Sequence, residues 1–358
     1  MQVKELQFQG IQFLDISYTE TYSSDILIIT PGIGAFKENY LSYAQSFQKQ
    51  FGKIIILSLP SQGSKGKWSI GSITDTLAII IKEYLFTYRT LHHSKVFLTG
   101  HSAGAVGSIM YVLGYSQEIE SLLCGKSLDK LDIKTNAKIK DALSKNDRCE
   151  VEGLMLLSPI NNFREVFKPF ILKNIKKCSE FFIKCVLHMF VNIPTYILGK
   201  LIKNSECKQL TISYKKTQYC ALINNSHKPI IDHFLNFIGV TNFVNLLLEY
   251  SKTISDNNSI KKLLSSFYKI NKYVIMGELD WVARTSFSKK RGLINYIRDV
   301  DNTEVYVSNK LGHFLSSRWS LDLNLNSQML NNDIVVNKCH YFIKKCNRRK
   351  LKNENKAL

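Results

Sequence analysis

The stretch Lys95-Val-Phe-Leu-Thr-Gly-His-Ser-Ala-Gly104 decides the fold of this chain. Its apolar run Val96–Leu98 predicts a buried strand, and the mostly apolar segment 105–113 predicts a helix directly after it. A sharp turn must join these two elements, because few residues separate them. Gly100 and Gly104 permit the strained backbone and the close contact between strand and helix that such a turn requires.

Ser102 lies at the tip of this expected turn, where its hydroxyl is lifted out of the sheet. The turn also places the backbone amide of Ala103 at the N-terminus of the helix, a position that can bind an oxyanion. Ser102 is therefore a candidate nucleophile, although Gly-x-Ser-x-Gly alone is a weak pattern. The rest of the chain must supply a base, an acid and a second oxyanion donor.

Apolar runs and helical segments alternate along most of the chain. The expected strands are Val3–Gln7, Ile11–Tyr18, Asp25–Thr30, Lys53–Leu59, Val96–Leu98, Val151–Leu157, Tyr273–Met276 and Val305–Val307. The expected helices span 37–50, 73–88, 105–113, 285–297 and 328–346. Because most of these strands are continuous apolar runs, they predict an α/β fold, with a mostly parallel sheet that has helices on both faces.

The alternation is interrupted in the middle of the chain, which predicts three regions. Residues 1–158 and 269–358 are expected to form the two parts of an α/β core, the second with a basic C-terminal tail. Residues 159–268 are expected to form an inserted helical cap, because Phe, Ile, Leu and Lys recur there at helical spacing without strand–turn–helix alternation. The polar residues 121–150 are expected to be loop and weak helix.

A serine nucleophile needs a histidine that takes its proton and a carboxylate that orients this histidine. In a parallel sheet, functional groups lie just beyond the C-terminal ends of the strands. Asp280 follows the strand at 273–276 and His313 follows the strand at 305–307, so both are expected at the same edge as Ser102. The chain order Ser, Asp, His is the order expected for a serine on a sharp strand-to-helix turn.

With these motifs, most of residues 1–158 and 270–330 resembles the α/β-hydrolase superfamily. Within it, the pattern is most similar to the monoacylglycerol lipase, lysophospholipase and serine-aminopeptidase group. Pro31-Gly-Ile-Gly34 stands where that group usually has His-Gly-x-Gly, Gly277-Glu-Leu-Asp280 matches its acid motif, and Gly312-His313 matches its base motif. The resemblance implies a Ser102–His313–Asp280 triad, with the amides of Ile33 and Ala103 as the oxyanion hole.

The sequence departs from the pattern of this group at two places. Pro31 replaces the usual histidine, but the backbone amide of Ile33 can still donate to an oxyanion, because that role uses no side chain. The loop at 60–64 lacks the usual Asp and Arg/His pair. We therefore expect this loop to support the oxyanion loop less firmly, which lowers the expected activity.

Other interpretations of the site residues stay open. Ser102 can belong to a hydrolase fold that no longer catalyses a reaction, and His313 can be a solvated loop histidine. Asp280 can be an ordinary loop carboxylate, in which case Asp232 or Asp75 takes its place. His101, next to the serine, is expected to be a buried structural partner rather than a base.

The net charge of +19 is concentrated in two segments. Residues 160–268 carry 15 Lys and Arg against 6 Asp and Glu, and residues 338–358 carry 8 against 1. Between Phe170 and Lys203, apolar residues are flanked by lysines, as in a helix that lies on a lipid surface. We expect peripheral contact with an anionic membrane through the basic cap and tail, with a solvated lysine-rich surface as the alternative. Nucleic acid is disfavoured, because the basic stretches lack the organisation of nucleic-acid-binding motifs.

The remaining features concern cofactors and location. The eight cysteines form no Cys-x-x-Cys pair and no zinc spacing, so no metal or organic cofactor is expected, and free thiols indicate a reducing compartment. No secretory signal and no apolar stretch of membrane-spanning length is recognised, so a cytoplasmic location with peripheral membrane contact is expected.

The resemblance implies a serine esterase that acts on a lipid such as a lysophospholipid or a monoacylglycerol. A peptidase or thioesterase with the same triad, or a non-catalytic hydrolase-fold binding protein, is the alternative.

Overall fold

The computed structural model of the chain describes a large part of the core and smaller parts of the segment between its two halves. The described residues are 2–18, 23–33, 35–60, 62–66, 68–86, 94–123, 131–144, 151–159, 208–214, 217–223, 240, 242–247, 250, 258–278, 280, 302–309, 311–312, 315 and 333–357.

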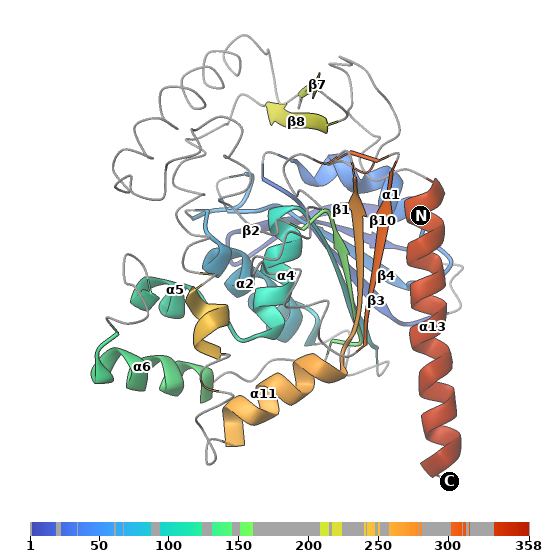
Figure 1. The fold of residues 1–358 in the computed structure, drawn as a ribbon. Coiled ribbons are helices and arrows are strands. Elements are labelled where there is room, and N and C mark those ends of the chain that lie inside the picture. Colours follow the sequence, from blue (N-terminus) through green and yellow to red (C-terminus); the bar gives the residue numbers. More distant parts are fainter. Residues whose placement is uncertain are drawn as a thin grey trace.

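An eight-stranded sheet forms the centre of the protein (Figure 1). Its strands are β1 (Gln2–Phe8), β2 (Ile11–Ser17), β3 (Ile26–Thr30), β4 (Lys53–Leu57), β5 (Val96–His101), β6 (Gly153–Leu157), β9 (Asn271–Gly277) and β10 (Thr303–Ser308). Their order in the sheet is β1-β2-β4-β3-β5-β6-β9-β10. β2 pairs antiparallel with β1 and β4, whereas all other neighbours pair in parallel. This arrangement is that of the α/β-hydrolase fold, so the expected fold class is confirmed.

Helices cover both faces of the sheet (Figure 1). One face carries α2 (Ile70–Ile79), α4 (Ala103–Val112), α5 (Gln117–Leu123), α6 (Ile133–Ser144) and α11 (Asn258–Lys269). The other carries the 3-10 turn η1 (Lys37–Tyr40), α1 (Leu41–Gln45) and α13 (Asp333–Ala357). Successive strand residues alternate between the two apolar clusters, as Ile28 and Ile29 do. The central strands are apolar on both sides because each side is covered by helices.

Several helices differ from their expected bounds. The helix expected over 328–346 begins at Asp333 and continues to Ala357, and the helix expected over 285–297 lies outside the described residues. The helix expected over 37–50 is reduced to η1 and the short α1, because the following amides of Ser46 and Phe47 bond three residues back and tighten the chain into turns. The helix expected over 73–88 begins earlier, at Ile70, because the hydroxyl of Ser69 accepts a hydrogen bond from the Ser72 amide at 2.9 Å and caps it. It continues as a π-helical turn, η2 (Ile80–Tyr84).

Part of the segment 159–268, expected to be helical, is a hairpin. β7 (Lys208–Tyr214) pairs antiparallel with β8 (Thr217–Ile223). Thr, Ile and Tyr recur in both strands, and β-branched and aromatic residues favour strands. The end of the same segment packs on the core, where the Phe243 ring lies 4.9 Å from that of Tyr115. Residues 160–207 and 224–239 lie outside the described residues.

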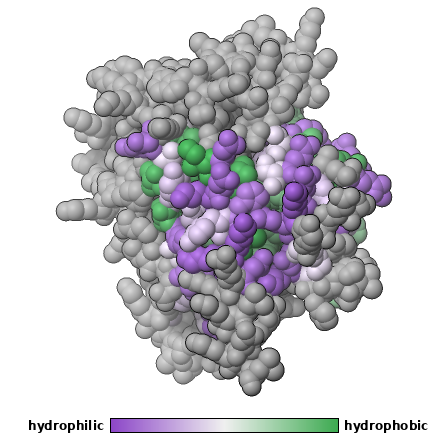
Figure 2. All heavy atoms as spheres, turned by 90° about the vertical axis from the view of Figure 1, so that its right-hand side faces the viewer, coloured by the Kyte–Doolittle hydropathy of each residue, from purple (hydrophilic) through white to green (hydrophobic). Residues whose placement is uncertain are grey.

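α13 packs along the sheet and continues beyond it (Figure 1). One helical face is buried: Val335, Cys339, Phe342, Ile343 and Cys346. The side chain of Asn347 accepts a hydrogen bond from Lys95, which precedes β5, so the helix reaches the amino-terminal edge of the parallel strands at this residue. The ten residues 348–357 extend roughly 15 Å further. Figure 2 shows that hydrophilic residues cover most of the described surface on this side. None of the helices described is long and apolar enough to cross a membrane.

A buried ion pair joins β2 to β4. Nζ of Lys53 donates to both carboxylate oxygens of Asp15, at 2.8 and 2.7 Å, and the hydroxyl of Tyr84 donates to the same carboxylate. Asp15 is 5% exposed and Lys53 is 9% exposed. Burial removes the water that would otherwise solvate these charges, so each depends on its partner.

Replacing Lys53 by Met leaves the Asp15 carboxylate buried without its counter-ion. We expect the free energy of unfolding to fall by about 3–5 kcal/mol, the usual effect of removing one partner of a buried ion pair. The double variant Asp15→Leu/Lys53→Met replaces both charges by apolar groups and should recover most of this loss. Urea unfolding of the three proteins measures the effect, and a Lys53→Met variant as stable as wild type would contradict it.

Candidate active site

Ser102 occupies the sharp turn between β5 and α4. Its φ and ψ angles are 55° and −118°, a combination that residues other than glycine rarely adopt. Its amide donates to the carbonyl of Leu157 in β6 at 2.9 Å, and its carbonyl accepts from the amides of Ala105 and Val106. The amide of Ala103 is the first of α4, and helix geometry gives it no intrahelical acceptor. A strained serine and an available helix amide thus lie together at the carboxyl edge of the central strand.

Gly100 and Gly104 allow three backbone segments to meet at this turn. A Cβ atom on Gly100 would collide with the backbone of Gly104 and Ala105. The carbonyl oxygens of Thr30 and Pro31 lie where a Cβ atom on Gly104 would stand. The absence of side chains at both positions therefore lets α4 begin against β5, as the sequence predicts, and also against the end of β3.

The loop after β3 lies against the serine. A Cβ atom on Gly32 would be 3.1 Å from both the Cβ atom of Ser102 and Nδ1 of His101, so loop and turn are in contact. The Gly32 amide donates to the hydroxyl of Tyr40 at 3.0 Å. Ile33 follows directly in this loop, and the role of its amide as an oxyanion donor stays a prediction.

Tyr40 connects this loop to His101. Its hydroxyl oxygen lies 2.9 Å from Nδ1 of His101, and the two side chains are 0% and 1% exposed. His101 is thus a buried structural partner, as its position beside the serine suggests. Tyr40 falls within the helix expected over 37–50, and sequence reasoning misses its contact because nothing in the sequence indicates the partner of a tyrosine hydroxyl.

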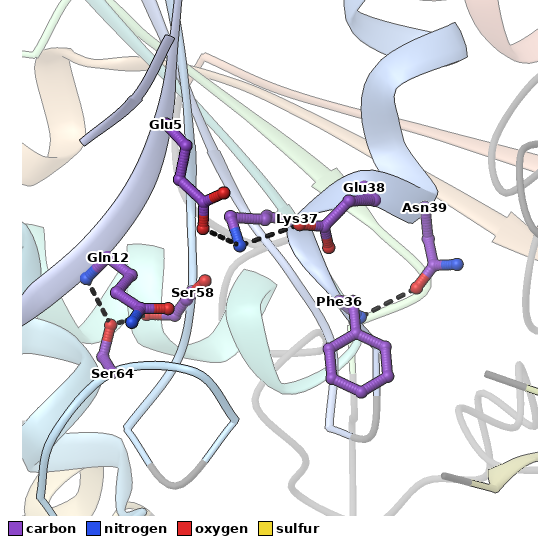
Figure 3. Close-up of polar contacts among 8 residues, drawn as sticks. All are labelled: Glu5, Gln12, Phe36, Lys37, Glu38, Asn39, Ser58 and Ser64. Atoms are coloured by element: carbon purple, nitrogen blue, oxygen red, sulfur yellow. Dashed lines mark hydrogen bonds and ion pairs between the residues drawn. The ribbon is translucent and has the colours of Figure 1, made fainter. Parts of the chain in front are cut away.

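Polar contacts anchor the residues that follow the loop (Figure 3). Nζ of Lys37 lies 3.0 Å from Glu5 of β1 and 2.8 Å from Glu38. Burial lowers the pKa of Lys37, but the hydrogen bonds and charges of Glu38 and Glu5 outweigh this effect and raise the pKa above its ordinary value. Oδ1 of Asn39 accepts a hydrogen bond from the Phe36 amide at 2.8 Å. η1 is therefore tied both to β1 and to the chain that precedes it.

Ser64 fixes the second loop at this edge, residues 60–66 (Figure 3). Its hydroxyl accepts from the amide of Gln12 in β2 and donates to the carbonyl of Ser58, both at 2.8 Å. These bonds connect the loop to β2 and to the end of β4. The described part of this loop is thus held by a serine and by backbone groups, although it lacks the Asp and Arg/His pair of the group that the sequence resembles.

Asp280 follows β9 and is fully buried. Its amide donates to the carbonyl of Gly277 at 3.1 Å. The carbonyl oxygen of Leu311 lies where a Cβ atom on Gly277 would stand, so the residues just before His313 pack against the end of β9. His313 itself lies outside the described residues, as does Asp232.

The sheet brings Ser102 and Asp280 to one edge. The parallel register aligns His101 of β5 with Leu157 of β6, and Leu157 with Ile275 of β9. Both side chains therefore follow the carboxyl ends of strands that are separated by β6 alone. Asp75, the other described candidate acid, lies in α2, and its carboxylate accepts from the Gln117 amide at 3.2 Å at the start of α5.

The two cysteines of α13 are poor candidates for a nucleophile. Cys339 and Cys346 are buried thiols that form no disulfide. Burial raises the pKa of the Cys339 thiol to about 12, although a hydrogen bond from Tyr43 acts in the opposite direction, so the thiol is protonated at neutral pH. Among the described residues, no three His, Cys, Asp or Glu side chains gather in a group that could hold a metal ion.

No protein-family model matches the chain, and no curated protein matches it in sequence. Similar solved structures include a lipase-esterase related protein from Clostridium acetobutylicum, with 13% identity, 93% of this chain and 99% of that chain covered, and a TM-score of 0.46. The Pyrococcus furiosus esterase Pf2001 has 13% identity, with 96% and 91% covered and a TM-score of 0.48. A membrane phospholipase A described as a bacterial virulence factor has 12% identity, with 97% and 86% covered and a TM-score of 0.46. At such low identity, the activity must be inferred from the residues of this chain.

The strain at Ser102 predicts that glycine stabilises the turn. Ser102→Gly relieves the unfavourable φ, whereas Ser102→Ala retains it, so we expect the glycine variant to be more stable by about 1–2 kcal/mol in urea unfolding. Ser108, in the helical interior of α4, is the matched control. There the order reverses, and Ser108→Gly should be less stable than Ser108→Ala by about 0.5–1 kcal/mol. The same order at both positions would contradict strain at Ser102.

Proposed function

We propose that the protein is a serine hydrolase that cleaves a carboxylic ester. The observation that carries this proposal is the backbone of Ser102, a non-glycine residue with φ of 55° between β5 and α4 and in contact with the loop after β3. A strained serine at this place is typical of a nucleophile elbow rather than of an ordinary strand–helix connection. The buried carboxylate of Asp280 at the same edge offers the charge that a catalytic histidine requires.

In the proposed reaction, the hydroxyl oxygen of Ser102 attacks the carbonyl carbon of the ester while His313 takes the hydroxyl proton. The amides of Ile33 and Ala103 stabilise the negative charge that develops on the carbonyl oxygen. His313 then gives the proton to the leaving alcohol, and Asp280 orients the imidazole and stabilises its charged form. Water, deprotonated by His313, attacks the acyl-enzyme and releases the acid.

The substrate that we propose is a lipid ester such as a lysophospholipid or a monoacylglycerol. The support comes from the sequence between Phe170 and Lys203, which lies outside the described residues and combines apolar side chains with lysines. Such a composition suits an acyl chain beside an anionic head group. A peptidase, a thioesterase and a non-catalytic fold are the competing proposals. Lysophospholipids, monoacylglycerols, thioesters and aminoacyl amides tested side by side distinguish them.

A fluorophosphonate probe tests the enzyme proposal, because it reacts with an activated serine. Wild type should label and Ser102→Ala should not, while Ser108→Ala serves as a control serine in the same region that should still label. On p-nitrophenyl butyrate, Ser102→Ala and His313→Ala should each lower kcat by roughly ten-thousand-fold or more. Asp280→Asn should also lower kcat strongly, because it favours the wrong tautomer of the histidine. A folded wild-type protein that does not label would refute the proposal.

We further propose that the basic cap and tail bring the protein to anionic lipid surfaces. In the tail, residues 348–357 carry five Lys and Arg against one Glu and extend beyond the amino edge of the sheet. Ser102 lies at the opposite, carboxyl edge. A lipid that enters at Ser102 therefore approaches from the other end of the protein, and the contributions of the tail and the cap are separable by experiment.

Truncation after Asn347 removes the basic end of α13. The full chain should co-sediment with vesicles that contain phosphatidylserine at low salt and dissociate at high salt, whereas neutral phosphatidylcholine vesicles should not bind it. We expect the truncated chain to bind roughly tenfold or more weakly, but still measurably, because the cap retains its own basic residues. No binding of the full chain to the anionic vesicles at low salt would contradict the membrane proposal.

A further inference from the structure

We propose that Tyr40 is a positioning residue for the oxyanion hole. Its hydroxyl joins the Gly32 amide to His101 and so holds the loop that carries the Ile33 amide against the turn that carries Ser102. This inference rests on the proposed hydrolase function. Tyr40 touches no reacting atom and acts on the oxyanion hole through the loop that carries the Ile33 amide.

The Gly32–Tyr40–His101 hydrogen bonds, called the bridge below, connect two segments whose separation matters for the reaction. Gly32 follows β3, and His101 is the last residue of β5, directly before Ser102. Tyr40 Oη lies 3.0 Å from the Gly32 amide nitrogen and 2.9 Å from Nδ1 of His101. One hydroxyl therefore fixes the loop relative to the nucleophile turn, in addition to the direct contact of their backbones.

The chemistry of the groups fixes the direction of the first hydrogen bond, and the direction of the second depends on the tautomer of His101. A backbone amide can only donate, so the Tyr40 oxygen accepts from Gly32. We assign the hydroxyl proton of Tyr40 to Nδ1 of His101, which then carries its own proton on Nε2 as a neutral imidazole. Amide, phenol and imidazole form one continuous chain in which each hydrogen bond polarises the next.

Burial makes this chain sensitive to the loss of the hydroxyl. Tyr40 and His101 are 0% and 1% exposed, so bulk water does not replace a lost partner. Without the hydroxyl, the Gly32 amide loses its acceptor, and we expect the loop to move until the amide finds another one. Because the amide of Ile33 is the next along the chain, it moves with Gly32.

A displaced oxyanion donor affects the transition state more than the bound substrate. The donor is directed at the position where negative charge develops in the transition state. The carbonyl oxygen of the bound substrate carries less charge and forms a weaker hydrogen bond with the donor. Loss of the Tyr40 hydroxyl should therefore lower kcat and leave KM unchanged. If the role of Tyr40 were purely structural, loss of its hydroxyl would change stability without lowering kcat at unchanged KM.

Tyr43 provides a matched control on the same side of the sheet. It is equally buried, at 0% exposure, and its hydroxyl lies 3.4 Å from Oγ1 of Thr99 in β5 and 3.5 Å from Sγ of Cys339 in α13. These contacts join helices to the central strand and do not involve the loop after β3. Tyr43→Phe therefore removes a buried hydroxyl without disturbing the proposed bridge.

The experiment compares Tyr40→Phe and Tyr43→Phe with wild type. The measurements are urea unfolding, kcat and KM for p-nitrophenyl butyrate, and the rate of inactivation by a fluorophosphonate. We expect Tyr40→Phe to lose roughly tenfold to a hundredfold in kcat and in inactivation rate at unchanged KM, whereas Tyr43→Phe stays within about twofold. A Tyr40→Phe variant with wild-type kcat, or equal losses in both variants, overturns the positioning role.

Variants of His101 test the bridge independently and keep it falsifiable if Tyr40→Phe does not fold. An Asn side chain places a hydrogen-bonding atom close to the position of Nδ1, whereas Leu does not. His101→Asn should retain most of kcat, and His101→Leu should lose about as much as Tyr40→Phe. The double variant Tyr40→Phe/His101→Leu should lose little more than either single variant, because both break the same chain. Equal activities of the Asn and Leu variants overturn the bridge.

The outcome for the bridge is distinguishable from that for the proposed function. A folded wild-type protein that neither labels nor hydrolyses any ester overturns both. A wild type that reacts, together with a Tyr40→Phe variant that reacts equally fast, overturns the positioning role alone.

Discussion

The meeting of three backbone segments at Gly100 and Gly104 is the constraint on which the candidate site depends. The end of β5, the start of α4 and the end of β3 approach one another where no side chain fits. Ser102 is inserted between β5 and α4 at this point, so its strained conformation is imposed by the packing of its neighbours. At the same place, the loop that contains Gly32 packs against the turn at Ser102. Serine, helix amide and loop are therefore parts of one arrangement, and a change that opened it would move all of them together.

Apolar packing and polar contacts have different roles around this arrangement. The central strands are covered on both faces, and their burial sets the positions of the strand ends. The loops that leave these ends are held by hydrogen bonds and ion pairs as well as by apolar contacts such as that of Ala35. Lys37 ties η1 to β1, and Ser64 ties its loop to β2 and β4. The sheet thus determines where each loop begins, and the polar contacts help to fix its conformation.

Sequence reasoning predicts the buried strands from continuous apolar runs, and it predicts the turn at Ser102 from the glycines on either side of the serine. It overestimates the helix after β3, because apolar spacing does not reveal that bonds three residues back tighten Ser46 and Phe47 into turns. It misses the hairpin β7–β8, where the lysine-rich surroundings obscure the Thr and Tyr positions. Tyr40 reaches its partners across 8 and 61 positions of the chain, and no fixed spacing encodes such a contact. Ser102 and Asp280 are placed at one edge as expected, while His313 stays a prediction.

The position of α13 has a consequence for how the protein is made. This helix covers one face of β6 and β9, with Phe342 stacked on Tyr273 and in contact with Gly153. A ribosome releases the chain from its N-terminus, so β5 and the serine turn emerge long before β9 and α13 exist. Until α13 docks, the part of β6 and β9 that it covers stays exposed to water. The docking of α13 therefore completes the cover of β6 and β9 only after these late residues have been made.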